Sequence, residues 1–177
     1  MSRKRGISLT IYFFDIAALV VMDQLVKLYA IRNLQGQPER PLIQGFLHLT
    51  YLENTGAAFG FLAGFDWAQI VLTVFKLVVL AAAGWYFFKL PNESRFTLLR
   101  VPLVLVIAGG IGNLIDRVRF GHVVDMFVFR FINFPVFNVA DIYVTTGIFL
   151  FAIMILFVVK DAPYFGYDKT KLETQES

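Results

Sequence analysis

The sequence contains no cysteine, only two histidines, and few charged residues for its length. Without cysteine the chain has no thiolate nucleophile. The histidines, His48 and His122, lie far apart in the sequence and make a poor metal site. We therefore expect neither a metal ion nor another cofactor.

Hydrophobic residues are abundant instead: they make up 58% of the 177 residues, and the mean hydropathy is +0.67. This composition exceeds that of a soluble domain of the same size. Four apolar stretches, 7–31, 67–90, 98–115 and 142–159, are each near the ~20 residues needed to cross about 30 Å of hydrocarbon. The composition predicts an all-α polytopic membrane protein with four transmembrane helices, forming one integral membrane domain over residues 1–177.

A cleavable signal peptide is the alternative interpretation of the first apolar stretch, because three basic residues precede it at positions 3–5. The stretch is longer than a typical signal-peptide core and lacks a small-residue cleavage site near its end. It also carries Asp15, Asp23 and Lys27. These features favour a retained first span.

The positions of Lys and Arg predict the orientation, because cytoplasmic loops carry the excess of basic residues. With the N-terminus inside and four spans, nine basic residues fall on the inner side and four on the outer side. The inner residues are Arg3, Lys4, Arg5, Lys89, Arg95, Arg100, Lys160, Lys169 and Lys171, and the outer ones are Arg32, Arg40, Arg119 and Arg130. Both termini, including the polar tail 160–177, are therefore expected in the cytoplasm, and the net charge of +3 does not require nucleic-acid binding.

The segment between the first two spans differs from the rest of the chain. Residues 46–52 alternate in polarity and are rich in β-formers, so we expect short strands in a small extracytoplasmic β-sheet and loop region. A turn is expected at residues 54–56. The following residues, 57–62, are too short to span and too apolar for open water. We expect them on the outer membrane surface, as a cover over the helices.

The third span carries glycines within residues 109–112, which would let helix backbones approach each other closely. Asn113, Asp116 and Arg117 follow at helical spacing and share one face. The alternative to a functional site here is a helix contact with a local Asp116–Arg117 pair.

Lys76 falls near the middle of the second span, where an ammonium is costly unless it finds a partner. We expect it to face the interior of the bundle and to pair with Asp15 or Asp23. A structural ion pair or a side chain that reaches the membrane surface are the alternatives to a functional role.

Asp125 and Asp141 lie between the last two apolar stretches, and each has a structural alternative. Asp125 is placed to pair with Arg119 or Arg130, and Asp141, preceded by Asn138, to cap the fourth span. Taken together, both fall on one membrane face with 15 residues between them, so their carboxyl groups can meet. Such a pair holds one acid and one base at neutral pH, which is the chemistry that activates water against an amide.

Two other classes of protein remain open on the residues alone. Ionisable residues in spans also mark small proton-coupled or ion-coupled transporters, although we find no internal repeat and the aspartates lie at the membrane boundary. A scaffold whose polar residues only hold helices together is the second alternative.

Five blocks of the sequence resemble, in the same order, those of the bacterial lipoprotein signal peptidases, the signal peptidase II family of membrane aspartic proteases. The blocks are DQLVK at 23–27, NTGAAF at 54–59, GGIGNLIDR at 109–117, VVD at 123–125 and FNVAD at 137–141. Only the two ends of the chain, 1–16 and 160–177, fall outside the resemblance.

The resemblance implies an aspartic endopeptidase that removes signal peptides from prolipoproteins, cutting on the amino side of a cysteine that carries diacylglycerol. It implies that Asp125 and Asp141 form the catalytic dyad. The other matching positions are associated with holding the site and the substrate: Asp23, Lys27, Asn54, Gly56, Asn113, Asp116, Arg117, Asn138 and Ala140.

The resemblance also implies the surroundings of the site. The expected partners are lipid-modified prolipoproteins and membrane lipids, without nucleic acid. The expected location is the bacterial cell membrane, with the active site near the extracytoplasmic face. In the expected mechanism one aspartate takes a proton from water and the other donates one. Asn54 or Asn138 would donate to the substrate carbonyl, and Arg117 would position the substrate.

Overall fold

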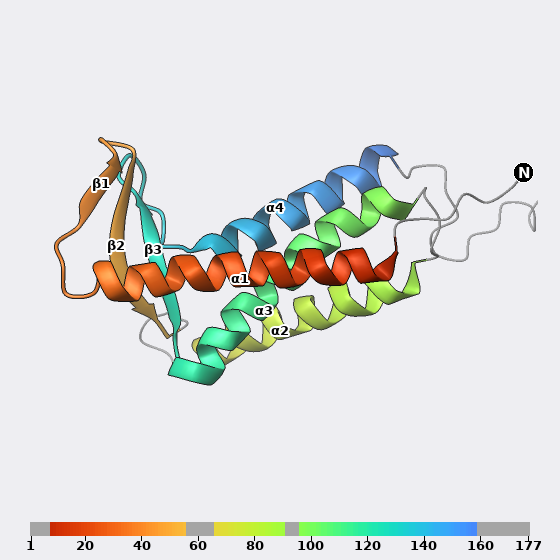
Figure 1. Ribbon diagram of the computed structural model, residues 1–177, viewed down its shortest axis with the longest axis horizontal. Coiled ribbons are helices and arrows are strands. Elements are labelled where there is room, and N and C mark those ends of the chain that lie inside the picture. Colours follow the sequence, from red (N-terminus) through yellow and green to blue (C-terminus); the bar gives the residue numbers. More distant parts are fainter. Residues whose placement is uncertain (1–7, 56–65, 91–95, 159–177) are drawn as a thin grey trace, which may run out of the picture.

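The computed structural model describes residues 8–55, 66–90 and 96–158. Within them, long helices run side by side and a small sheet closes one end of the bundle (Figure 1). The helices are α1 (Leu9–Asn33), α2 (Asp66–Lys89), α3 (Thr97–Phe120) and α4 (Val139–Ile153), the last continued by a π-helical turn, Met154–Val158. The strands are β1 (Arg40–Ile43), β2 (Leu47–Asn54) and β3 (Val123–Phe129).

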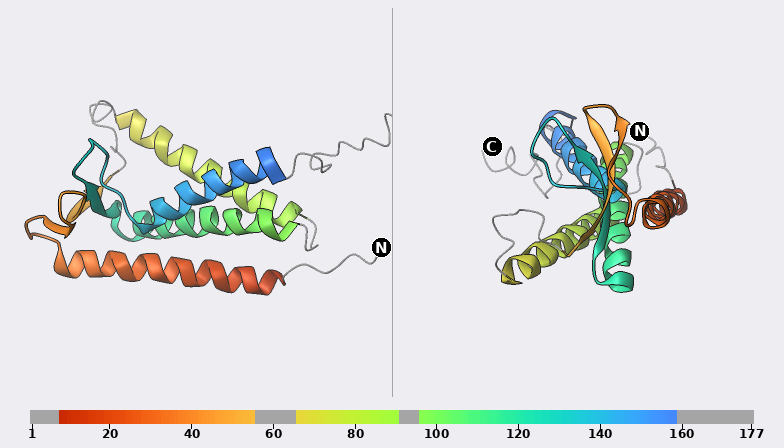
Figure 2. Two further views of the ribbon diagram at one scale, coloured as in Figure 1. Left: turned by 90° about the horizontal axis from the view of Figure 1, so that it is seen from above. Right: turned by 90° about the vertical axis from the view of Figure 1, so that its left-hand side faces the viewer.

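Three of these helices, α1, α3 and α4, are long and apolar enough to cross a membrane. In the apolar window of α3, 56% of the residues are buried, against 11% for α1 and for α4, so α3 is the central helix. The other helices pack around it, with α1 and α2 on different sides (Figure 2). The predicted multi-pass membrane protein with a helical bundle is confirmed. α2 is a further helix of 24 residues.

Two helix ends differ from the predicted spans because of their capping residues. α4 begins at Val139 and not at 142, because Asn138 caps it: the Asn138 side chain accepts from the Asp141 N–H, and the Asp141 side chain accepts from the Asn138 N–H. α3 continues past the predicted end at 115 to Phe120. It stops where Gly121 adopts a left-handed φ of 77°, which glycine tolerates without strain.

The glycines of α3 bring its backbone against two neighbours, as predicted. A Cβ at Gly112 would lie 2.5 Å from a carboxylate oxygen of Asp23 on α1, and one at Gly109 would overlap the carbonyl oxygen of Ala140 on α4. Any larger side chain would push these helices apart. Close approach at these two glycines therefore sets the distance between α1, α3 and α4 where the polar residues gather.

The sheet is antiparallel, in the order β1-β2-β3, so the segment before α2 pairs with the segment before α4. β2 confirms the strand predicted within 46–52, and β1 lies before that segment. β3 was not predicted as a strand, because its run of apolar residues does not alternate in polarity. In the register, Leu52 lies opposite Asp125 and Asn54 opposite Val123. The strand pairing therefore brings Asn54 beside Asp125.

Candidate active site

Asp125 lies on β3 and is fully buried, with 0% of its surface exposed. Its two carboxylate oxygens accept hydrogen bonds from side-chain amides: Asn54 Nδ2 lies 2.6 Å from Oδ2 and Asn138 Nδ2 lies 2.5 Å from Oδ1. The pKa of Asp125 is raised from 3.8 to about 6. Burial is the largest cause, the Asn54 hydrogen bond acts in the opposite direction, and the charge of Asp141 raises the pKa further. Asp125 therefore titrates close to neutral pH.

Asp141 lies in the first turn of α4 and is half-buried. Asn113 on α3 donates from Nδ2 to Asp141 Oδ1 at 2.9 Å. The backbone N–H of Asn138 donates to Asp141 Oδ2 at 3.3 Å, while the Asn138 side chain donates to Asp125. Asn138 thus contacts both carboxylates, and the prediction that the two aspartates meet in one site agrees with this geometry.

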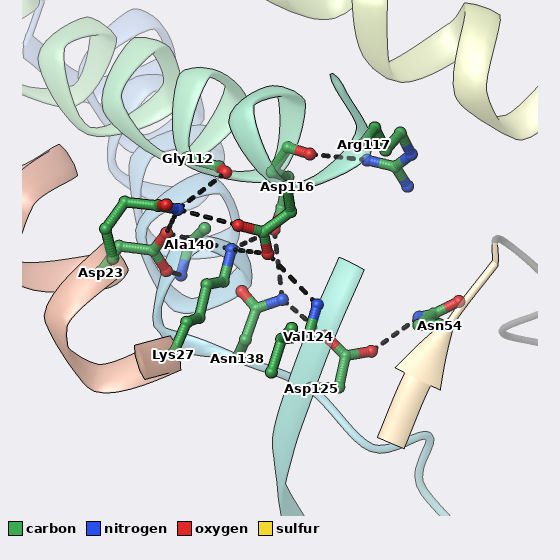
Figure 3. Close-up of polar contacts among 12 residues, drawn as sticks. Asp23, Lys27, Asn54, Gly112, Asp116, Arg117, Val124, Asp125, Asn138 and Ala140 are labelled. Atoms are coloured by element: carbon green, nitrogen blue, oxygen red, sulfur yellow. Dashed lines mark hydrogen bonds and ion pairs between the residues drawn. The ribbon is translucent and has the colours of Figure 1, made fainter. Parts of the chain in front are cut away.

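A buried lysine, Lys27, joins α1 to α3 near Asn138 (Figure 3). Lys27 Nζ lies 3.0 Å from Asp23 Oδ2 and 2.8 Å from Asp116 Oδ2, and it donates to Asn113 Oδ1 at 3.0 Å. Buried charges are tolerated when they are paired and hydrogen-bonded in this way. Because Asn138 Nδ2 also donates to Asn113 Oδ1 at 3.1 Å, the lysine cluster and the aspartate pair form one continuous polar network.

Backbone N–H groups tie the same carboxylates to the other elements. The N–H of Ala140 donates to Asp23 Oδ1 at 2.9 Å, and the N–H of Val124 donates to Asp116 Oδ2 at 3.2 Å (Figure 3). Asp23 therefore holds the start of α4, and Asp116 holds the strand that carries Asp125.

Most of the residues expected to form the site are brought together, and one residue was missed. Gln24 donates from Nε2 to Asp116 Oδ1 at 2.9 Å and to the Gly112 carbonyl at 3.2 Å. Gln24 directly follows Asp23 in the sequence, and this position could have predicted that it belongs to the site. Gly56 and the expected cover at 57–62 lie outside the described residues.

Three structural alternatives raised from the sequence are wrong. Arg130 forms an ion pair with Glu39 and does not pair with Asp125. Arg119 lies over the ring of Phe120, 4.9 Å from its centroid. Asp116 pairs with Lys27 and not with the neighbouring Arg117. The expected cap by Asp141 is confirmed as half of a capping box, but the same side chain also faces Asn113.

Lys76 also differs from the prediction. Its side chain is exposed and, among the described residues, forms no ion pair with Asp15 or Asp23, since Asp23 pairs with Lys27. Lys76 instead lines a cleft of about 290 Å³ between α2, α3 and α4. Asn113, Arg117 and Asp141 line the same cleft, which opens the aspartate site toward apolar helix surfaces. Arg117 donates to the Asn113 carbonyl at 3.4 Å.

Comparisons with known proteins agree with this geometry. A family model described as Signal peptidase (SPase) II matches residues 16–157. A lipoprotein signal peptidase of Streptococcus pneumoniae is 46% identical over 138 residues, which cover 78% of this chain and 87% of that protein. A lipoprotein signal peptidase of Clostridioides difficile is 40% identical over 147 residues, covering 83% of this chain and 95% of that protein.

Two solved structures, each described as a bacterial membrane enzyme studied by the in meso method, share the fold. One has a TM-score of 0.70 at 28% identity and covers 91% of this chain and 95% of its own. The other has a TM-score of 0.71 at 29% identity and covers 89% and 99%. Since the family model and the similar relatives cover most of the sequence, the chain belongs to the signal peptidase II family of membrane aspartic peptidases.

Proposed function

We propose that Asp125 and Asp141 are the catalytic dyad with which this peptidase removes the signal peptide from lipoprotein precursors. The observation that carries the proposal is the double contact of Asn138, whose side-chain amide donates to Asp125 and whose backbone amide donates to Asp141. Two carboxylates held in one site divide the work of acid and base, because they do not ionise independently.

In the proposed mechanism, one carboxylate takes a proton from a water molecule as the water attacks the scissile carbonyl. The other donates a proton to the carbonyl oxygen, which forms a tetrahedral intermediate. When the C–N bond of that intermediate breaks, the first carboxylate passes the proton it took from water to the leaving amine, and the second takes its proton back as the carbonyl re-forms. A pKa of about 6 suits Asp125 to gaining and releasing a proton within one turnover near neutral pH. Because the two groups interact, the protons belong to the pair and not to either residue alone.

The asparagines have a positioning role in this mechanism. Asn54 and Asn138 hold the two oxygens of Asp125, and Asn113 holds one oxygen of Asp141. Preorganised donors of this kind need no rearrangement when charge moves during the reaction. Arg117, which lines the cleft beside Asp141, is placed to meet a carbonyl of the substrate peptide.

The proposed substrate is a precursor whose cysteine carries diacylglycerol, cut on the amino side of that cysteine without a metal or cofactor. The proposed topology has four spans, with both termini in the cytoplasm and the aspartates near the extracytoplasmic face of the bacterial cell membrane. The excess of basic residues on the inner side supports this orientation. The sheet and the aspartates lie at the same end of the helices, which supports a single catalytic face (Figure 1).

The test compares the purified parent with Asp125→Asn and Asp141→Asn on a peptide that carries the lipid-modified cysteine and on its unmodified counterpart. Each variant should remain folded in detergent and lose cleavage by at least about 1,000-fold, as expected when an acid or base is removed from a unit that acts together. Full activity in either variant would disprove the dyad. Equal cleavage of the two peptides by the parent would disprove the requirement for lipid.

A further inference from the structure

Lys76 is the one cation in the wall of the cleft that the proposed mechanism leaves without a role. Apart from Lys76, the polar residues that line the cleft are Asn113, Arg117 and Asp141, and the remaining lining residues are apolar or glycine. The cleft therefore has a lysine of α2 in a wall that is otherwise apolar, apart from the three residues of the aspartate site.

The packing of the helices places Lys76 at the depth of Asp141. Leu80 on α2 lies against Gly110, 2.8 Å from the position of an added Cβ, and Val144 on α4 lies 2.8 Å from that of the adjacent Gly109. Both α2 and α4 run away from the sheet (Figure 1). Lys76 lies about one helical turn before Leu80 on α2, and Asp141 lies about one turn before Val144 on α4. Lys76 and Asp141 are therefore each about one turn closer to the sheet than Gly109 and Gly110.

Among the described residues, Asp141 lines the same cleft as Lys76, but its carboxylate already accepts hydrogen bonds from two amides. Asp23, Asp116 and Asp15 are engaged elsewhere or face another groove. Asp23 and Asp116 both pair with Lys27. Asp15 lines a separate groove formed with residues 101–105 of α3. An ammonium beside a membrane span is costly unless something accepts its hydrogen bonds. A molecule that fills the cleft can supply such an acceptor to Lys76.

We propose that Lys76 donates hydrogen bonds to the ester carbonyl oxygens of the diacylglyceryl group on the substrate cysteine, and thereby selects the lipid-modified precursor. This inference rests on the proposed function. The scissile bond lies next to the modified cysteine, so the ester carbonyls are tethered to the reacting carbonyl through the cysteine side chain and the glycerol group. A lysine has three donors on a long flexible stem and no acceptor, which suits it to two neighbouring carbonyl oxygens.

The experiment uses two peptides with the same sequence and the same chain lengths, one with a diacyl (ester) group on the cysteine and one with a dialkyl (ether) group that lacks the carbonyl oxygens. For each enzyme the ratio of kcat/KM for the ester peptide to that for the ether peptide is measured. Because the ratio is taken within one protein sample, partial unfolding of a variant cancels. The variants are Lys76→Met, Lys76→Arg and, as a matched control at the far end of the same helix, Lys89→Met.

The parent and Lys89→Met should prefer the ester by about 10-fold, the usual effect of a hydrogen bond to a charged group. Lys76→Met should bring the ratio to about 1, mainly through a higher KM for the ester peptide, while Lys76→Arg should keep part of the preference. A parent without ester preference, or a Lys76→Met variant that keeps the parent ratio, would overturn the proposal. Failure of the dyad looks different, since Asp125→Asn would then cleave the ester peptide as well as the parent does.

Discussion

Lys27 donates to the side-chain oxygen of Asn113 across 3.0 Å, and this contact fixes which way the Asn113 amide points. With its oxygen turned to the ammonium, Asn113 directs its Nδ2 at Asp141, 2.9 Å away. Lys27 therefore orients a carboxylate that it does not contact. Because Lys27 is only 2% exposed, it is shielded from bulk water.

Replacing Lys27 by methionine should destabilise the protein strongly, because Asp23 and Asp116 would be left buried without their cation. Removal of one partner from a buried ion pair costs about 3–5 kcal/mol. Thermal unfolding in detergent measures the loss, and Lys89→Met, at the end of α2, provides a control that should unfold like the parent. If Lys27→Met and Lys89→Met unfolded at the same temperature, the structural role of the cluster would be wrong.

Two substitutions at Asn138 should separate its helix cap from its contact with Asp125. Asn138→Ala removes both and should cost about 1 kcal/mol of stability together with activity. Asn138→Ser keeps a capping oxygen but removes the amide that donates to Asp125, so it should retain stability and lose activity. The measurement is melting temperature and kcat for both variants. Full activity in the serine variant would show that the amide does not position Asp125.

Asn54→Ala should move the pH dependence of cleavage to higher pH. The Asn54 hydrogen bond lowers the pKa of Asp125, which is about 6, because it favours the charged carboxylate. Without that bond the carboxyl holds its proton to a higher pH. The midpoint of the acidic limb of the kcat/KM profile should therefore move to higher pH. Tyr51→Phe, on the same strand, removes a hydroxyl that contacts Glu53 and should leave the limb in place. If the midpoint of this limb stayed fixed or moved to lower pH in Asn54→Ala, the Asn54 hydrogen bond would not lower the pKa of Asp125.

Asp125→Asn should change how stability depends on pH. Because the pKa of Asp125 is raised from 3.8 to about 6 in the fold, the folded protein binds this proton more tightly than the unfolded chain does. The unfolding free energy of the parent, relative to that of the variant, should therefore fall by about 3 kcal/mol between pH 3.8 and about 6. Unfolding of both proteins across this range tests the sign, and parallel curves would contradict it.

Gly112→Ala should destabilise the bundle, because the new Cβ would lie 2.5 Å from Asp23 Oδ2. Overpacking of this kind typically costs about 1–3 kcal/mol. Gly84→Ala on α2 is the matched control, since its Cβ would meet nothing within 4 Å, and it should be neutral or slightly stabilising. Equal melting temperatures for the two variants would mean that α1 and α3 are not in close contact at Gly112.

Much of this fold could be predicted from the sequence because its signals are local. Apolar runs predict the helices, and the glycines of α3 predict its close contacts. The C-terminal end of α3 and the start of α4 were not predicted correctly. They are set by single capping residues, Gly121 and Asn138, and do not coincide with the limits of the apolar runs. β3 was missed because its buried residues do not alternate in polarity along the strand, so the usual strand pattern is absent.

The site divides in the same way. The expectation that Asp125 and Asp141 share one site follows from their place between two spans. Which cation neutralises Asp116 could not, because Lys27 lies on another helix and reaches it only after α1 and α3 pack. The neighbouring Arg117 looked equally suitable along the sequence, which contains no information on how the helices are rotated against each other.

The edges of the sheet limit how a peptide can approach. On β3, the N–H of Val124 is bound to Asp116, and those of Met126 and Phe127 are bound to the carbonyl of Phe137. On the opposite edge, β1 contains Pro41, which has no N–H to offer. Among the described residues, the β3 edge beside Asp125 therefore leaves few free N–H groups for strand addition, a common way for proteins to hold extended peptides. We therefore expect side chains and helix surfaces to contact a substrate backbone that reaches the aspartates.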